Sequence, residues 1–484
     1  MWKMDMVTVA PVARRKDYHC DDFLRVSLLF NPMKTLVWTS VAALMLAGGF
    51  DSPAIAQNIP IQEHMTPNGM KVLVVEDPSI PNVAMYTWFH VGSRNEHEGI
   101  TGISHFFEHM MFNGAKKYGP GQFDDVLALA GGENNAYTSN DVTVYQDWFP
   151  ASALETAFDL EADRIQYLTF APALVKSERE VVYSERRSSV DNNNPELLNE
   201  QMEATAFEAA PYHWPVLGWP TDIESWTQAD LKAYFAMGYS PSNATMIVVG
   251  EVKAADVFKL ADQYIGPIPV HDPPPPIRTK EPVQLGERRV YVNKFAEAPL
   301  LDIGYHAVNA KSPDYWTFQM INNLLSTGES SRFYKTLVDG QQLAITVNSG
   351  MQPMLDPGLF EVFAQPREGV PVEKLEKAIY AEMDKLAATG PTVEELQKAK
   401  TQEIADYYRA LRSIAGRAQE VGEAEVIFGD YHLLPSVEQK VNAVTAADVQ
   451  RVMKEYLKPT NRTVATLIPT ADDGPAAAAT EVKK

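Results

Sequence analysis

Two kinds of apolar pattern alternate along the chain. Runs rich in β-branched and aromatic residues, at 83–91 and 142–149, predict strands. Segments with apolar residues three and four positions apart predict helices. In chain order these helical segments are 100–115, 121–131, 151–167, 172–190, 371–389 and 391–428. Strands and helices mixed in this way predict an α+β fold in which helices pack on antiparallel sheets.

The pattern occurs twice along the chain. Residues 227–243 read TQADLKAYFAMGYSPSN, residues 445–461 read TAADVQRVMKEYLKPTN, and an apolar run follows each. The offset that aligns these two segments also aligns Val72 with Val290, near the start of each half. One offset that holds at both ends predicts a duplicated domain. We therefore expect two homologous repeats, each an antiparallel sheet packed with helices.

Composition predicts where the repeats begin and end. The proline-rich segment 267–282 is expected to be a stiff, extended linker. It separates a first repeat at 57–266 from a second repeat at 283–469. The Ala- and charge-rich segment 470–484 is expected to be a frayed tail.

The segment 1–56 has the pattern of a targeting sequence. Met33-Lys34 precedes an apolar run from Leu36 to Phe50, and Ala54-Ile55-Ala56 forms a cleavage pattern. A membrane anchor is the alternative, but a spanning helix needs about 20 apolar residues. We therefore predict a non-native upstream extension at 1–32 and a signal peptide at 33–56. The mature chain is then exported, with no stable membrane insertion.

Charge and cysteine content narrow the classes of function. The 484 residues include 42 Lys and Arg against 63 Asp and Glu, which gives a formal net charge of −21. With 45% hydrophobic and 22% charged residues, wholesale disorder and a multi-span membrane protein are excluded. The negative charge makes nucleic acid an unfavourable partner. The single cysteine, Cys20, excludes a disulfide framework and any multi-cysteine metal site.

The segment that points to chemistry is His105-Phe106-Phe107-Glu108-His109. On a helix, residues four apart share one face, with their Cβ atoms about 6 Å apart. Two imidazoles there suit tetrahedral Zn²⁺, and the pattern is H-x-x-E-H, the inverted zincin motif. Such a short pattern also arises by chance, so the surrounding sequence has to decide.

A catalytic zinc site needs a third protein ligand and leaves the fourth position for water. The candidate is Glu185, in the segment SEREVVYSERR. Glu178 precedes it by two turns along the same helix face. From there it could hydrogen-bond a histidine ligand from behind.

The flanking segments resemble a known family. These are GSRNEHEGITGISHFFEHMMFNG around the motif, the Gly-Gly-x-x-Asn-Ala-x-Thr pattern at 131–138, YHWPVLGWPTDI at 212–223 and YSPSNATMIVVG at 239–250. Over 57–469 the chain resembles the pitrilysin/insulinase zinc metallopeptidases with the inverted motif. Within them it is similar to the bacterial branch that resembles mitochondrial processing peptidase.

This resemblance implies a role for each motif residue. His105, His109 and Glu185 would hold one Zn²⁺ per chain, Glu108 would be the general base, and Glu178 would be a supporting catalytic carboxylate. In the family the third ligand is a glutamate at a typical distance past the second histidine, and Glu185 occupies that position. The implied activity is a zinc-dependent endopeptidase, placed in the periplasm by the predicted signal peptide.

The resemblance also implies how substrate binds. Asn135 and Ala136 would lie on an edge strand that pairs with the peptide. An edge strand with open N–H and C=O groups accepts an extended peptide by adding it to the sheet. This predicts oligopeptides or unfolded protein segments as substrates, with loose sequence preference. The plainer alternative is a helix stop followed by a hairpin edge.

The second repeat departs from the family pattern. Relatives carry an Arg and a Tyr there that stabilise the oxyanion, whereas this chain has Val338 and Ile345. Arg332 and Tyr334 belong to a separate, structural part of the pattern. Losing an oxyanion donor typically costs about 10²–10³ in rate. We therefore predict a homologous partner subunit that lacks H-x-x-E-H, in a heterodimer that closes a chamber around the substrate.

Three alternatives stay open at this point. The chain could form a homodimer instead of a heterodimer. It could be a non-catalytic member of the family that binds peptides or scaffolds a complex. It could also be a maturation protease for one peptide, although no dedicated recognition insert is evident in the sequence.

Overall fold

The computed structural model describes residues 59–470. The predicted extension at 1–32, the predicted signal peptide at 33–56 and the predicted tail beyond Thr470 lie outside the described residues. Within them, no helix is both long and apolar enough to cross a membrane.

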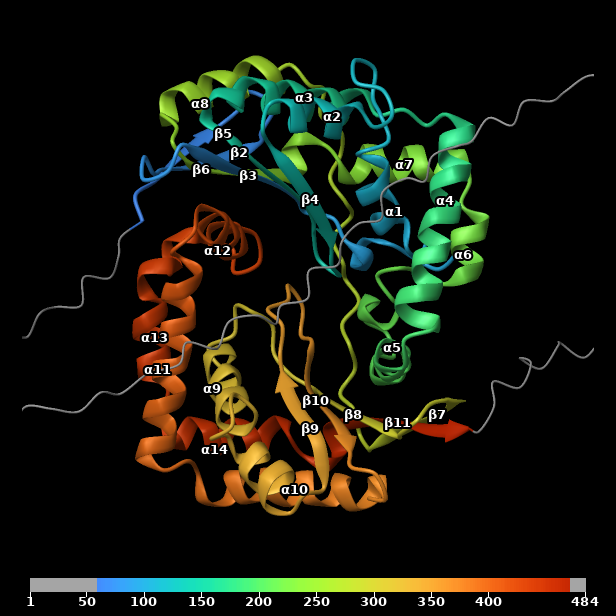
Figure 1. Ribbon diagram of the computed structural model, residues 1–484, viewed down its shortest axis with the longest axis vertical. Helices are drawn as coiled ribbons and strands as arrows, with labels where there is room; N and C mark the ends of the chain where they lie inside the picture. The colour runs from blue at the N-terminus through green and yellow to red at the C-terminus, as the bar shows by residue number, and fades with distance from the viewer. Residues whose placement is uncertain (1–58, 471–484) are drawn as a thin grey trace, which may run out of the picture. The chain divides into compact units, whose positions relative to one another are not determined.

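Two β-sheets form the centres of the described chain (Figure 1). The first has the order β1-β2-β6-β3-β5-β4, and the second has the order β7-β11-β8-β10-β9. The strands of the first sheet are β1 (Ile61–Met65), β2 (Lys71–Glu76), β3 (Asn82–Phe89), β4 (Glu133–Thr138), β5 (Thr143–Pro150) and β6 (Ala244–Gly250). Those of the second are β7 (Arg288–Phe295), β8 (Leu300–His306), β9 (Ala344–Gly350), β10 (Leu359–Pro366) and β11 (Arg462–Thr470).

The helices are distributed over both halves of the chain. The first half contains α1 (Ile103–Met110), α2 (Gln122–Leu129), α3 (Leu154–Tyr167), α4 (Pro172–Arg186), α5 (Asn194–Ala206), α6 (Pro220–Ser225), α7 (Gln228–Gly238) and α8 (Ala254–Leu260). The second contains α9 (Tyr315–Leu325), α10 (Val372–Thr389), α11 (Val393–Ala410), α12 (Ile414–Val426), α13 (Val437–Ala443) and α14 (Ala446–Tyr456). The predicted α+β class is therefore confirmed.

The prediction of purely antiparallel sheets is wrong for one strand pair in each sheet. β2 runs parallel to β6, and β7 runs parallel to β11. The parallel pairing arises from the position that the last strand of each half takes in its sheet. β6 lies between β2 and β3, and because these two strands run in opposite directions, β6 must be parallel to one of them. Both sheets are therefore mixed.

The predicted helical segment 391–428 is interrupted. α11 ends at Ala410 and α12 begins at Ile414. Ser413 starts the new helix, since its side chain accepts a hydrogen bond from the Gly416 N–H at 2.9 Å. The sequence pattern missed this break because both helices present apolar residues at helical spacing.

The duplication expected from the sequence is visible in the structure. The same offset relates α7 to α14, and β6 to β11. α7 and α14 even begin with the same capping box, formed by Thr227 with Asp230 and by Thr445 with Asp448. Residues 267–287 contain neither helix nor strand. The domain boundaries that we place at 266 and 283 stay predictions.

Alternate residues of a strand point to opposite faces of the sheet. Each sheet carries buried apolar residues on both faces. In β2, Val72 and Val74 face the helices of the first half, whereas Leu73 and Val75 face a second cluster. The second sheet is apolar on one face and mixed on the other, where Leu300 and Leu359 share the face with the buried Asp302. Each sheet therefore needs a helical layer on both sides.

The second layer comes from the other half of the chain. α12 covers the first sheet, with Ala418 and Val421 in the same cluster as Leu73 and Trp88. α5 covers the second sheet, where Leu198 joins residues of β8, β10 and β11. α5 and α12 have 13 residues each and follow α4 and α11, so they are corresponding helices of the two repeats. The repeats exchange these helices.

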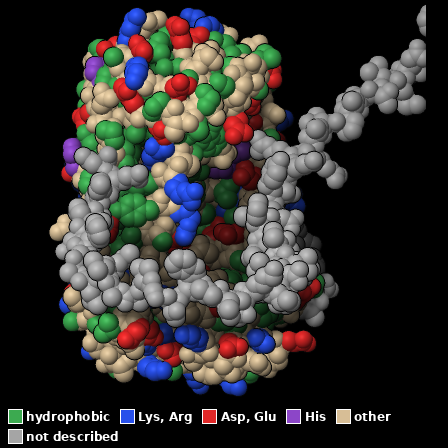
Figure 2. Space-filling view, turned by 60° about the vertical axis from the view of Figure 1, so that its left-hand side comes forward, with side chains coloured by type: hydrophobic (Ala, Val, Ile, Leu, Met, Phe, Trp, Pro, Cys, Tyr) green, Lys and Arg blue, Asp and Glu red, His purple; other side chains and the backbone are tan. Residues whose placement is uncertain are grey.

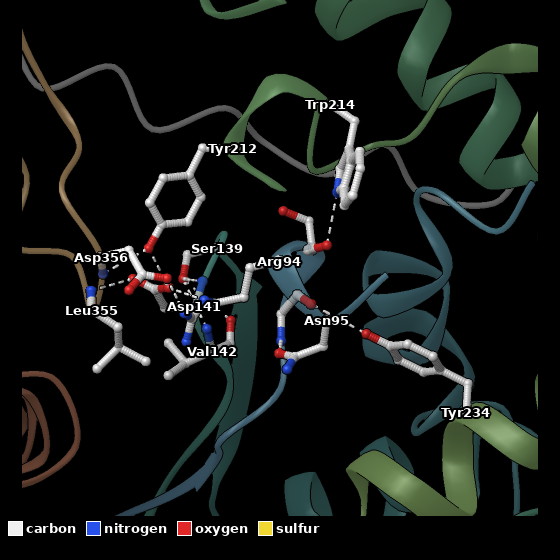
Figure 3. Close-up of polar contacts among 12 residues, drawn as sticks. Arg94, Asn95, Ser139, Asp141, Val142, Tyr212, Trp214, Tyr234, Leu355 and Asp356 are labelled. Atoms are coloured by element: carbon white, nitrogen blue, oxygen red, sulfur yellow. Dashed lines mark hydrogen bonds and ion pairs between the residues drawn. The ribbon is translucent and has the colours of Figure 1, made fainter. Parts of the chain in front are cut away.

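A polar network adds to this contact between the halves (Figure 3). Arg94 pairs with Asp141 of the first half and Asp356 of the second. The Tyr212 hydroxyl donates to Asp141 at 2.8 Å, and the Leu355 N–H donates to the other oxygen of Asp141 at 2.9 Å. Burial raises the pKa of Asp141, and the Leu355 and Arg94 contacts oppose that shift. The loop before β10 is thus held against the turn between β4 and β5.

The surface charge is not gathered in one patch on the face shown in Figure 2. Acidic and basic side chains are interspersed there, and hydrophobic side chains are visible where the surface is hollowed at mid-height. The charge on this face is therefore mixed in sign.

We predict that Gly422→Ala destabilises the protein. Gly422 lies on α12 against the Trp88 ring, and an added Cβ would lie 2.3 Å from two of its atoms. Overpacking of this kind typically costs about 1–3 kcal/mol, which denaturant unfolding measures. Gly350→Ala is the matched control, because its Cβ would meet no atom within 4 Å. Equal stability losses in the two variants would contradict the packing of α12.

Candidate metal centre

The motif helix α1 is fixed at its first turn. It begins after Gly102, whose φ of 83° lies in the left-handed region that glycine adopts readily. The N–H groups of Gly102 and Ser104 both donate to the Glu96 carboxyl at 2.8 Å. Burial raises the pKa of Glu96 to about 8, although these hydrogen bonds oppose the shift. Glu96 thereby satisfies two of the open donors of the helix.

A second segment holds the approach to α1. One oxygen of Asp222, in α6, accepts hydrogen bonds from the Gly99 N–H and from both the N–H and hydroxyl of Thr101. Gly218 lies so close that an added Cβ would be 2.3 Å from the Thr101 carbonyl oxygen. The YHWPVLGWPTDI segment therefore positions the helix that carries H-x-x-E-H.

Three side chains converge beside α1. His105 and His109 share one face of the helix, with ring centroids 4.8 Å apart. α4 packs alongside α1 and brings Glu185 to them (Figure 1). Glu185 lies 3.7 Å from His105 Nε2 and 3.1 Å from His109 Nε2. One ligand atom from each residue lies within 4.8 Å of the others.

This spacing fits a tetrahedral metal ion. With metal–ligand bonds of about 2.0–2.1 Å, neighbouring ligand atoms lie about 3.3 Å apart. The distances from His105 and His109 run to the two different carboxylate oxygens of Glu185, and single ligand atoms of the three residues lie within 4.8 Å of one another. Two imidazole nitrogens and one carboxylate oxygen are also a ligand set that Zn²⁺ accepts. His105, His109 and Glu185 could therefore hold the metal.

Glu178 supports one of these histidines from behind. Its Oε1 lies 2.7 Å from His109 Nδ1, and its Oε2 accepts a hydrogen bond from Asn113 at 2.6 Å. This leaves His109 Nε2 directed at the metal position. Asn113 was not recognised in the sequence, where it stands as an ordinary polar residue after the motif.

The two histidines have opposite pKa shifts. Burial lowers the pKa of His105 to about 4, and the charge of His109 adds to this. Burial also opposes the charge on His109, but hydrogen bonds to Glu178 and Glu185 raise its pKa to about 9. A metal ion binds the neutral imidazole, so it would compete with a proton for His109.

Glu108 lies on the same helix but outside the three-residue group. Its Oε2 accepts a hydrogen bond from the Thr138 hydroxyl at 2.6 Å. Burial raises the pKa of Glu108, and the Thr138 hydrogen bond partly offsets this. Thr138 is the last residue of β4, so the strand fixes the carboxylate. The sequence placed Thr138 in a family pattern without indicating this contact.

Asn135 and Ala136 lie on β4, at the edge of the first sheet. β4 pairs with β5 on one side and has no other partner strand in the described part of the chain. Asn135 is exposed and Ala136 is half-buried. The same strand thus carries an open edge and the residue that holds Glu108.

The structure locates the two residues of the second repeat that differ from the family pattern. Val338 lies in the short helix η7 (Tyr334–Gly340), and Ile345 lies in β9 with 55% of its surface exposed. Arg332 donates to Glu395 and to the Gly390 carbonyl. Arg332 is thus engaged within the second half, in agreement with a structural role.

Family models match most of the chain. The model for insulinase, peptidase family M16, matches residues 71–218. The model for the peptidase M16 inactive domain matches residues 225–403.

Individual proteins are similar over nearly the full length. The zinc protease PqqE of Helicobacter pylori is 31% identical over 445 residues, which cover 91% of this chain and 99% of that protein. The beta subunit of mitochondrial-processing peptidase from Blastocladiella emersonii is 26% identical over 427 residues, or 86% of this chain and 91% of that protein. The crystal structure of a protease from Helicobacter pylori superposes with a TM-score of 0.82 at 31% identity, over 85% of this chain and all of that one.

Two α+β repeats, with an H-x-x-E-H helix that faces a glutamate from a later helix, define the inverted-motif class of metallopeptidase folds. The chain belongs to the insulinase family of peptidases, family M16. The predicted family resemblance, including similarity to the mitochondrial processing peptidase branch, is confirmed.

We predict that Glu96→Ala destabilises the protein by about 1–3 kcal/mol, the usual cost of leaving a buried donor without a partner. Unfolding in denaturant, followed by circular dichroism, measures the loss. Glu96→Gln is the matched control, because its amide has nearly the same shape and keeps one acceptor oxygen. It should lose less stability than the alanine variant. Equal losses in both variants would rule out Glu96 as the cap of α1.

Proposed function

We propose that the chain is a zinc-dependent endopeptidase that hydrolyses oligopeptides or unfolded protein segments. The observation that carries this proposal is the convergence of His105, His109 and Glu185, with Glu108 on the same helix. Zinc is favoured over other divalent metals by the ligand set. The name of the similar Helicobacter pylori protein, zinc protease PqqE, supports the same metal.

The roles of the side chains follow from their positions. When bound, zinc polarises a peptide carbonyl and makes water more acidic. Glu108 accepts the proton of the attacking water and passes it to the leaving amine. Burial raises the pKa of Glu108, which makes the protonated form easier to reach. Glu178 keeps His109 oriented, and Thr138 keeps Glu108 in place.

The open edge of β4 is the proposed site for the peptide backbone. A peptide that pairs there would lie along Asn135 and Ala136, next to the residue that holds Glu108. Main-chain hydrogen bonds give affinity without selecting a side-chain sequence. Folded proteins expose few such segments, so extended or unfolded chains are the expected substrates.

Completion of the oxyanion site is assigned to a second subunit. Val338 and Ile345 have no N–H or O–H group in their side chains to donate. We propose that a homologous subunit lacking H-x-x-E-H supplies the Arg and Tyr, and that the two subunits close around a chamber. A homodimer is the alternative. The leader pattern at 33–56 supports a periplasmic location for this assembly.

The presence of Val338 and Ile345 in place of Arg and Tyr also favours a second candidate function. A family member without its oxyanion pair could bind peptides or scaffold a complex without hydrolysing them. The complete group of His105, His109, Glu185 and Glu108 favours the enzyme, because peptide binding alone does not require it.

We predict that Glu108→Gln retains zinc and loses hydrolysis, since the amide cannot accept the proton. Fluorogenic-peptide hydrolysis by the purified chain measures turnover, and metal analysis measures zinc. Loss of a general base typically costs about 10²–10⁴ in rate. Equal rates in the variant and the wild type would remove Glu108 from this role.

The wild-type chain serves as the reference in the same assay, with and without a metal chelator. We expect low turnover alone and a gain when a homologous subunit without H-x-x-E-H is added. Full activity of the pure chain would reject the two-subunit proposal. Bound zinc with no turnover under either condition would favour the peptide-binding alternative.

We also predict that substrate selection depends weakly on side-chain sequence. A randomised peptide library, cleaved by the active form and sequenced, tests this. Peptides with N-methylated backbone amides are the matched control, because they keep the side chains and lose main-chain donors. Dependence on one defined sequence, or full cleavage of the methylated peptides, would contradict pairing with β4.

A further inference from the structure

A second cavity lies away from the metal centre, in the second half of the chain. It has a volume of about 340 Å³ and lies between α9, α11, α12 and the segment 428–437. Its lining combines aromatic rings with carboxylates and includes no Lys, Arg or His.

The aromatic part of the wall is packed into a fixed arrangement. The rings of Trp316 and Phe428 are stacked, with centroids 6.1 Å apart. Tyr315 meets Phe428 edge-on at 5.2 Å. Tyr407 completes the wall, and its hydroxyl donates to the Leu434 carbonyl at 2.9 Å. These rings offer faces and edges but no positive charge.

The acidic part of the wall consists of Glu403, Asp406, Glu420 and Glu423. Asp406 pairs with Arg409 on its own helix, and Glu403 accepts a hydrogen bond from the uncharged Asn323. Among the described residues, no hydrogen bond or ion pair reaches the carboxyl groups of Glu420 and Glu423. Burial raises the pKa of each to about 7, and repulsion from Glu423 and Glu403 adds to the shift of Glu420.

We propose that this cavity binds an organic cation, an alkylammonium or guanidinium group on an apolar stem. Carboxylates that face one another in a cavity favour a positive ligand, because it offsets their mutual repulsion. Aromatic faces attract such cations and also pack against the stem. Lysine and arginine side chains of a peptide carry this group, and so do free diamines.

The position of Glu423 favours the peptide source. Glu423 also lines a neighbouring cavity of about 200 Å³ together with Tyr137 of β4. The Tyr137 hydroxyl is hydrogen-bonded to Gln419, one helical turn before Glu423 on α12. The cation pocket thus adjoins the strand assigned to peptide binding. This link, unlike the cation site itself, rests on the proposed function.

Butylguanidinium and its uncharged isostere butylurea test the site directly. Titrations followed by Trp fluorescence and by calorimetry measure their binding, and Trp316→Phe identifies the signal that arises in the pocket. We expect saturable binding of butylguanidinium and none of butylurea. The double variant Glu420→Gln with Glu423→Gln should weaken binding about tenfold or more, equivalent to about 1.4 kcal/mol.

Glu373→Gln with Glu394→Gln is the matched control, because it removes the same charge from exposed positions outside the cavity. It should leave the affinity unchanged, and circular dichroism confirms that both double variants fold. Equal weakening in both, equal affinity for butylurea, or no saturable binding up to about 10 mM, a range that covers weak ligands, would overturn the cation site.

A second arm separates the two sources of the cation. Peptides that contain one arginine, or citrulline in its place, are bound to the Glu108→Gln chain. Preference for arginine that disappears in the Glu420/Glu423 double variant supports the peptide source. Binding of butylguanidinium without that preference supports a free cation. Because neither readout uses hydrolysis, failure of the peptidase assay would leave the cation site standing.

Discussion

The structure depends on the burial of both faces of each sheet. A sheet with apolar residues on both faces is not stable with helices packed on one face only, because the second apolar face would remain exposed to water. In this chain the second layer for each sheet is a helix from the other repeat. Burial of Leu73 and Trp88 requires α12, and burial of Leu300 and Leu467 requires α5. Neither half can complete its own core.

The geometry of the candidate metal centre also depends on the exchange of helices between the repeats. Glu185 lies on α4, which is followed by the short helix η3 (Arg187–Asp191) and then by α5. Arg186, directly after Glu185, forms a buried ion pair with Glu200 of α5. Because α5 is packed on the second sheet, the helix that carries the third ligand is anchored to the second repeat. The second repeat is thus part of the frame that holds the candidate metal centre of the first.

The sequence predicted what is local or periodic. The i, i+4 spacing placed His105 and His109 on one face, and the constant offset between the two halves identified the duplication. Glu185 was assigned through the family resemblance, in which the third ligand lies at a typical distance past the second histidine. The exchange of α5 and α12 was not predictable in the same way. Apolar residues on a strand or helix show that a face is buried, but not which distant element covers it.

The supporting contacts of the site were missed for a related reason. Thr138, Asn113 and Glu96 lie in segments that carry the family resemblance, but the sequence does not show their hydrogen-bond partners. The parallel strand pairs were not predicted for the same reason. They depend on the positions that β6 and β11 take between other strands of their sheets, which the sequence pattern does not show. The spacing of residues along the sequence identifies side chains that lie together on one helix or strand. Side chains that meet from different helices or strands can be identified only from the three-dimensional structure.

Duplication also shows where the repeats have diverged. In the first repeat, the α4–α5 pair keeps an Arg–Glu bridge that stabilises the helix bearing Glu185. At the constant offset, the second repeat has Asn323 at the position of His105 and Glu403 at the position of Glu185, and Asn323 donates a hydrogen bond to Glu403. Glu403 lines a cavity together with Glu420 and Glu423, and that lining includes no Lys, Arg or His. Because neighbouring carboxylates repel one another, a ligand that supplies a positive charge would stabilise this part of the second repeat.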